Sequence, residues 1–174
     1  MVIPRIALAL LLALPAAAQP LSVTLRSRTE TFRGSGEWQE VAVPCRLEPR
    51  RAAIIICDVW DDHWCRGATQ RVGLLAPKIA KLVETARPRG IDHLLITGMH
   101  TNMCILNRTF AIKQMTRWGK KCILVRDLTD AMYDPQDRPY VSHAQGTELV
   151  IQHIEKYWSP TVLSADLLRA LAKR

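Results

Sequence analysis

Cys104 and Asp58 are the residues of this sequence whose types and positions best suit chemistry. In GMHTNMC (98–104) a glycine ends an apolar run, a polar turn follows, and Cys104 stands where a helix is expected to begin. With Thr101 or Asn102 as N-cap, the helix dipole and free N–H groups would lower the pKa of the thiol and could receive an oxyanion. Asp58 lies in another apolar run, where carboxylates are rare unless paired or functional. The pair predicts attack of a thiol on a carbonyl; an inert buried thiol and a loop-capping carboxylate are the alternatives.

Four apolar runs predict the strands that must position these two residues. The runs are AAIIICDVW (52–60), HLLITG (93–98), KCILVRD (121–127) and PTVLSA (160–165). The first is almost continuously apolar, which predicts a strand buried on both faces. Helical spacing of apolar residues is found over 72–86, 103–118, 150–157 and 166–171. This alternation predicts an α/β fold with an open parallel sheet of about four strands and flanking helices.

The carboxyl ends of the predicted strands collect polar and aromatic residues. Ligands of open α/β sheets bind at these ends. We expect Trp60, His63, Trp64 and Thr101 to line a pocket for a small-molecule substrate. For the two tryptophans, packing in the core or at the rim is an equal alternative.

The N-terminal part of the chain differs from the rest. Residues 1–18 are predicted to be a signal peptide, with a basic start, a short apolar core and a small-residue cleavage site. The apolar core is too short for a stable membrane anchor, so a periplasmic or extracellular protein is expected. Residues 19–50 are predicted to form a β extension of two strands joined by a glycine turn, and residues 51–174 the α/β domain.

Charge and cysteine content exclude some classes of function. The net charge is +8, but the basic residues are scattered and lack interleaved aromatic residues, so no nucleic-acid partner is expected. The spacing of the five cysteines matches no zinc ribbon. Cys57 and Cys122 lie inside strand-like runs and are expected to be buried and inert. Cys65 and Cys104 lie beyond such runs, and a disulfide between them is an alternative to a free nucleophile.

Two stretches, IIICDVWDDHWC and LLITGMHTNMCILNRTFAIKQMTRWGKKCILVRDLTDAM, resemble the isochorismatase-like cysteine hydrolases, which include the nicotinamidases. The family's second motif is roughly G-x-x-T-x-x-C-V. Gly98, Thr101 and Cys104 fall in register with it, and Ile105 replaces the valine. The resemblance covers about residues 52–168. Further matches, in the family's order, are Thr109, Ala111, Gly119, Asp127 and His143.

The resemblance implies a reduced isochorismatase-like fold and a role for each matched site residue. Cys104 would be the nucleophile of a hydrolase acting on a small amide, ester or vinyl ether, and Asp58 its acid and base. The N–H groups of His100 and Cys104 would form the oxyanion hole. A cis peptide is implied near Met99–His100.

One segment of the family's pattern is missing from this sequence. Family members carry a second strand, a loop with a catalytic lysine and another helix before the cysteine strand, whereas ETARPRG runs directly into IDHLLITG (84–98). The lysines of the preceding helix and Lys113 do not match that position. A catalytically impaired relative that serves as a binding or assembly module, with a homo-oligomer as one form of it, is therefore the alternative function. A gene model lacking a segment near Gly90 would also explain the gap.

A metal or redox site is a third hypothesis. Asp61, Asp62, His63 and Cys65 cluster after the first strand, and histidine with thiolate suits zinc. Asp62 and His63 are weak metal candidates, because the family's ligands lie in a D-x-H pattern that this chain does not clearly reproduce. No cofactor is expected, and zinc is the alternative.

Overall fold

The computed structural model describes residues 19–86, 94–108 and 110–173. The expected signal peptide, the junction at 87–93 and Thr109 lie outside these residues. The strands are β1 (Leu21–Glu30), β2 (Trp38–Leu47), β3 (Ala53–Cys57), β4 (Leu94–Met99), β5 (Cys122–Asp130) and β6 (Thr161–Val162). The helices are the 3-10 helix η1 (Pro49–Arg51) and the α-helices α1 (Arg66–Ala86), α2 (Cys104–Asn107), α3 (Ile112–Arg117), α4 (His143–Tyr157) and α5 (Ser164–Ala172).

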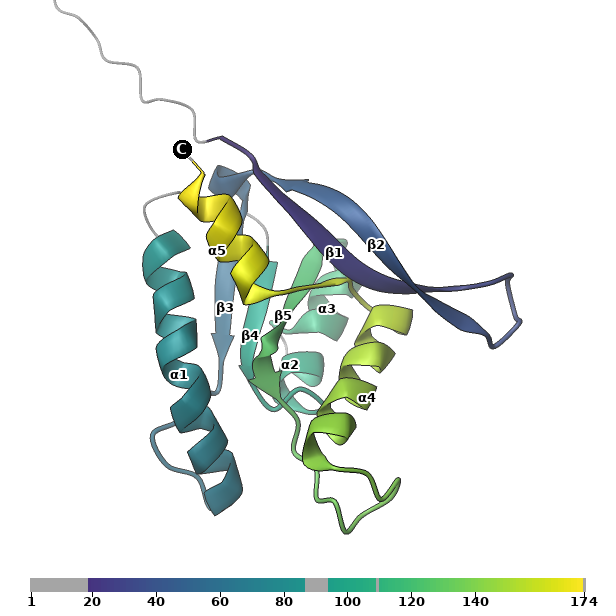
Figure 1. Ribbon diagram of the computed structural model, residues 1–174, viewed down its shortest axis with the longest axis vertical. Coiled ribbons are helices and arrows are strands. Elements are labelled where there is room, and N and C mark those ends of the chain that lie inside the picture. The colour runs from purple at the N-terminus through teal and green to yellow at the C-terminus, as the bar shows by residue number, and fades with distance from the viewer. Residues whose placement is uncertain (1–18, 87–93, 109, 174) are drawn as a thin grey trace, which may run out of the picture.

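All six strands form one sheet in the order β2-β1-β6-β5-β4-β3 (Figure 1). β3, β4, β5 and β6 run parallel to one another, which confirms the predicted α/β fold with its parallel strands. β1 runs antiparallel to both β2 and β6. The sheet therefore has six strands where about four were expected, because the N-terminal hairpin continues the same sheet.

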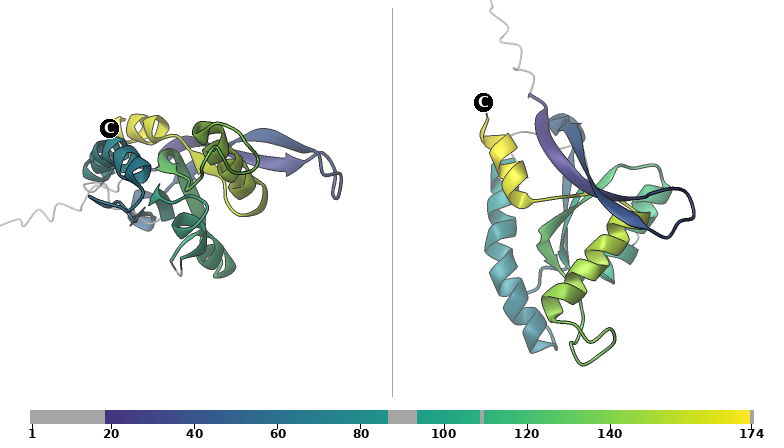
Figure 2. Two further views of the ribbon diagram at one scale, coloured as in Figure 1. Left: turned by 90° about the horizontal axis from the view of Figure 1, so that it is seen from below. Right: turned by 45° about the vertical axis from the view of Figure 1, so that its right-hand side comes forward.

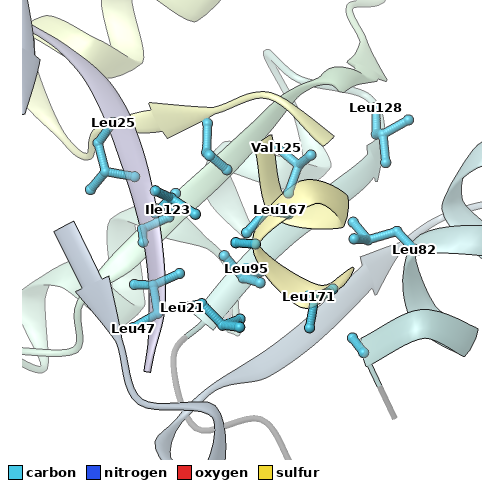
Figure 3. Packing of buried hydrophobic residues seen from close by; sticks show 14 of the residues in the cluster. Leu21, Leu25, Leu47, Leu82, Leu95, Ile123, Val125, Leu128, Leu167 and Leu171 are labelled. Carbon is cyan, nitrogen blue, oxygen red and sulfur yellow. The ribbon is translucent and has the colours of Figure 1, made fainter. Parts of the chain in front are cut away.

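Helices cover both faces of the sheet, as the views in Figures 1 and 2 show. α1 and α5 pack on one face, where Leu82 and Leu167 meet Leu95 and Val125 of the strands (Figure 3). On the other face, α2, α3 and α4 pack against the strand residues next to these in the sequence, Ile96 and Leu124. The helix residues in this second cluster are Ile105, Ile112, Ile151 and Ile154. Each fully buried leucine or isoleucine stabilises the fold by about 1.5–3 kcal/mol. None of the described helices combines the length and apolar character needed to cross a bilayer.

The hairpin of β1 and β2 is attached through side chains more than through backbone pairing. Its backbone meets β6 in one register pair, Arg26 with Thr161. The Glu155 carboxylate of α4 is fully buried and accepts from Arg26 Nε at 2.6 Å, Arg28 Nε at 3.1 Å and the Thr161 hydroxyl at 2.7 Å. The tip of the hairpin projects beyond the helices (Figure 1). This ion-pair network therefore holds the hairpin against α4.

Two local predictions were wrong. β3 was expected to be buried on both faces, but it is the edge strand, and Ile56 is 47% exposed. The single helix expected over 103–118 is divided into α2 and α3, because Arg108 and Ala111 adopt extended backbone conformations. The buried residues of this region are Ile105, Leu106, Ala111 and Ile112, whereas the predicted core residues Met103, Phe110 and Trp118 are exposed.

Candidate active site

Gly98 allows the ends of β3 and β4 to approach each other closely. Its φ is +112°, and a Cβ atom at this position would collide with the carbonyl oxygen of Cys57 in the paired strand. This backbone conformation and this lack of space both require glycine. The peptide bond between Met99 and His100 is cis, as the resemblance implies. The turn then brings the chain into α2, whose first residue is Cys104.

Cys104 and Asp58 meet at the carboxyl ends of the two adjacent parallel strands. The thiol and the carboxylate lie close enough for each to shift the pKa of the other. Asp58 directly follows β3 and has φ +49°, a left-handed conformation that aspartate tolerates better than most residues. The carboxylate side chain is 17% exposed, so the pair is partly shielded from water.

Arg108 joins this pair and was not recognised in the sequence. Its Nη2 atom donates to Asp58 Oδ2 at 2.8 Å, and the guanidinium also interacts with the Cys104 thiol. Arg108 lies four residues after Cys104, and residues four apart lie on the same side of a helix. This four-residue spacing was the feature of the sequence that could have placed Arg108 beside Cys104. The sequence did not show that Asp58 lies opposite this side of α2.

The electrostatics of the pair favour an ionised carboxylate next to a protonated thiol. Burial raises the pKa of Asp58, but the hydrogen bonds from Cys104 and Arg108 outweigh it and hold that pKa below its usual value. Burial and the Asp58 carboxylate raise the pKa of the Cys104 thiol. The expectation of a lowered thiol pKa was therefore wrong, because α2 has a single turn and a carboxylate accepts the thiol's proton.

The backbone around the thiol differs partly from the expected capping. The backbone hydrogen bond from His100 lowers the thiol's pKa, which places the His100 N–H beside the sulfur. Met103, not Thr101 or Asn102, is the N-cap of α2. The buried Thr101 hydroxyl bonds that of Thr129, and the Asn102 side chain bonds the backbone of Met132. These two residues thus fix the turn to the segment at the end of β5.

Aromatic rings surround His100. Trp60 stacks on His63 with ring centroids 4.6 Å apart, and both rings lie within 5.3 Å of the His100 ring. Burial and the neighbouring His63 lower the pKa of His100. Within the part of the chain that the structure describes, the buried His100 Nε2 has no hydrogen-bond partner. Trp64 is 79% exposed at the edge of this group.

A second polar cluster lies at the end of β5. The largely buried Asp130 accepts from Arg71 Nε at 2.6 Å and bonds His143 Nε2 at 2.8 Å. His143, which matched a family position, is the first residue of α4. Asp127, the other matched acid, lies inside β5 and caps α5 through Ser164. Asp130 therefore occupies the strand end at which the resemblance placed Asp127.

The expected substrate pocket is divided between two hollows. Cys104 lies in a hollow of about 370 Å³ with Met103, Asn107 and Arg108. A larger hollow of about 670 Å³ lies between α1 and the segment before α4, and of the four predicted pocket residues it contains Trp64. Trp60 and His63 line neither hollow, and Thr101 is completely buried, so the prediction that Thr101 contacts substrate was wrong.

The side chains that suggested a metal site or a disulfide have other contacts in the structure. The Asp62 carboxylate accepts from the backbone N–H of His63, and His63 Nδ1 accepts from that of Cys65, so both side chains shape the turn before α1. Among residues 19–86, 94–108 and 110–173, three or more His, Cys, Asp or Glu side chains nowhere gather as metal ligands. All five thiols are free, so Cys65 and Cys104 are not bonded. Burial raises the pKa of Cys57 to about 12, consistent with an inert thiol.

Comparisons with known proteins give little beyond this geometry. No protein-family model matches the sequence, and no curated protein matches it. Among solved structures, the chain is similar to a cysteine hydrolase from Pseudomonas syringae pv. phaseolicola 1448A, with 22% identity and a TM-score of 0.37. The match covers 52% of this chain and 42% of that chain. A likeness this distant carries no argument about function, so the site is interpreted from its own residues.

Proposed function

We propose that this chain is a cysteine hydrolase of the isochorismatase-like type that acts on a small amide, ester or vinyl ether. One observation carries the proposal: the Cys104 thiol lies beside an Asp58 carboxylate whose pKa is held low and which Arg108 binds at 2.8 Å. A thiol needs an adjacent base to become a good nucleophile, and this arrangement supplies one. The motif that contains Gly98, Thr101 and Cys104 supports the family assignment.

With an amide or ester, Asp58 takes the thiol's proton while the Cys104 sulfur bonds to the carbonyl carbon. The tetrahedral intermediate then collapses, and the leaving group departs with the proton from Asp58. Water next attacks the thioester while Asp58 accepts one of its protons. The acid product leaves, and the proton returns to the sulfur. Each step moves a proton between Asp58 and an adjacent atom.

The backbone before Cys104 is the proposed oxyanion hole. The His100 backbone lowers the pKa of the Cys104 thiol, so its N–H would be close to the carbon that the sulfur would attack. The N–H of Cys104 itself, at the start of α2, would be the second donor. The 370 Å³ hollow beside the sulfur is small, which supports a small substrate.

Replacing Asp58 with asparagine tests the proposed base. An amide keeps the shape of the carboxylate but cannot accept the proton, so kcat/KM should fall by about 10²–10⁴-fold. Initial rates on a panel of small amides, esters and vinyl ethers measure this. The exposed Asp61→Asn is the matched control. Because the pKa of Asp58 is held low, wild-type activity should persist on acidification until below the ordinary carboxyl range of about pH 4. An Asp58→Asn variant as active as the control would contradict the assignment.

Export is also part of the proposal. It is supported by Arg5, by the apolar run Ile6–Leu14 and by the small residues Ala16–Ala18. Protein recovered from the periplasm of a bacterial host should begin at Gln19 on N-terminal sequencing. Full-length chain confined to the cytoplasm would contradict export.

A further inference from the structure

Arg108 is the one charged side chain in the hollow that contains Cys104. It is the residue at which α2 ends, and its side chain is about half exposed. Its Nη2 atom lies 2.8 Å from Asp58 Oδ2, and the guanidinium also interacts with the Cys104 thiol. A single cation thus binds Asp58 directly and lies in the same hollow as Cys104, whose thiol pKa it lowers.

The two acidic groups need such a cation. Burial opposes ionisation of both Asp58 and Cys104, and the Asp58 carboxylate raises the cost of a negative charge on the Cys104 sulfur. Arg108 acts in the opposite direction on both groups, because its positive charge favours the ionised carboxylate and the ionised thiol. The base therefore stays ionised in the resting site, and negative charge is stabilised while the proton moves.

We propose that Arg108 is a positioning residue that holds the Asp58 carboxylate ionised and oriented toward the Cys104 thiol. This inference rests on the proposed function. The cation of this site then comes from the helix that begins with the nucleophile, and a lysine from a separate loop is not required. The missing lysine was the reason to consider a catalytically impaired relative. With Arg108 as the cation of the site, the missing lysine no longer favours that alternative.

The neighbouring Lys113 does not fill this role. Its Nζ donates to Asn107 Oδ1 at 2.8 Å and lies 5.3 Å from the centre of the Trp158 ring. Arginine also suits the position better by its shape, because its planar fork presents several N–H groups to two acceptors at once. Lys113 therefore provides a matched control: a cation on the next helix, outside the contacts of Asp58.

The experiment compares Arg108→Gln, Arg108→Lys and Lys113→Gln with the wild type in two measurements. In the first, kcat/KM of Arg108→Gln should fall by about 10²-fold, mainly through kcat. The kcat/KM of Arg108→Lys should lie within about tenfold of the wild-type value, because lysine restores the positive charge but not the planar guanidinium. Lys113→Gln should behave as wild type. An Arg108→Gln variant that changes KM alone would overturn the proposal, since that result assigns Arg108 to substrate binding.

The second measurement does not depend on turnover. The rate of Cys104 alkylation by iodoacetamide is followed against pH by peptide mass spectrometry, with the Cys45 peptide as internal reference. Removing the guanidinium should move the midpoint of the Cys104 profile to higher pH and slow alkylation at pH 7.5 by about threefold to tenfold. Arg108→Lys should restore most of this shift. Unchanged profiles in all variants would overturn the inference.

The two measurements distinguish the inference from the proposed function. If no substrate of the panel is hydrolysed but the alkylation profile moves as expected, the proposed function fails while Arg108 still sets the charge state of the pair. If hydrolysis requires Cys104 but Arg108→Gln leaves kcat and the alkylation profile unchanged, the function stands and the role of Arg108 is wrong.

Discussion

Replacing Cys104 with alanine is expected to abolish hydrolysis, leaving rates indistinguishable from the uncatalysed reaction. The thiol has the Asp58 carboxylate beside it as a base, and the His100 backbone lowers its pKa. Removing a nucleophile from a cooperative site typically costs about 10⁶-fold in kcat, because the remaining groups have nothing to activate. The assay is product formation from the best substrate of the panel, followed over hours at high enzyme concentration.

Two further variants make this result specific. Cys104→Ser keeps a nucleophilic atom but a far less acidic one, so it should also lose nearly all activity. Cys45→Ala removes a partly exposed thiol from the distant hairpin and should leave kcat unchanged. Hydrolysis that survives in Cys104→Ala would assign the reaction to another residue.

Replacing Glu155 with alanine is expected to lower the free energy of unfolding by about 3–5 kcal/mol. This carboxylate is fully buried and is the shared acceptor for Arg26, Arg28 and the Thr161 hydroxyl. Its loss would leave two partly buried guanidinium groups without their main partner. Because one backbone pair joins β1 to β6, the hairpin should separate from α4 before the rest of the domain unfolds.

Urea unfolding followed by circular dichroism measures this effect, and Glu148→Ala is the matched control. Glu148 also contacts Arg26, at 2.9 Å, but its side chain is 40% exposed. An ion pair with such an exposed partner is worth less than about 1 kcal/mol, so the control should unfold close to the wild type. Equal losses of unfolding free energy in the two variants would show that the burial of Glu155 does not determine how much this carboxylate stabilises the fold.

The fold was predictable where hydrophobic pattern alone decides it. Continuous apolar runs correctly predicted the parallel strands, and alternation with a glycine turn correctly predicted the N-terminal hairpin. The pattern could not show that the hairpin shares the sheet, because that depends on contacts between residues far apart in the sequence, such as Arg26 and Glu155, which lie 129 positions apart. It also could not show that β3 is an edge strand, since strand order is not contained in the composition of one strand.

The meeting of Cys104 and Asp58 followed from a general rule: carboxyl ends of parallel strands share one edge of the sheet. The charge state of the thiol did not follow, because it depends on burial and on the neighbouring carboxylate more than on the start of a short helix. Arg108 was missed for a related reason. Its partner Asp58 lies 50 positions earlier, and the pairing of β3 with β4 in the folded sheet brings them together.

The most direct test of the central claim is to stop turnover with acid and map the modified peptide by mass spectrometry. The mechanism predicts an acyl group, derived from the substrate, on the sulfur of Cys104 as a thioester that hydroxylamine removes. Asp58→Asn should carry less of it in the same time, because the base acts in the first step. Steady hydrolysis with the acyl group on another residue, or with no adduct on Cys104 at any quench time, would contradict a covalent mechanism at this cysteine.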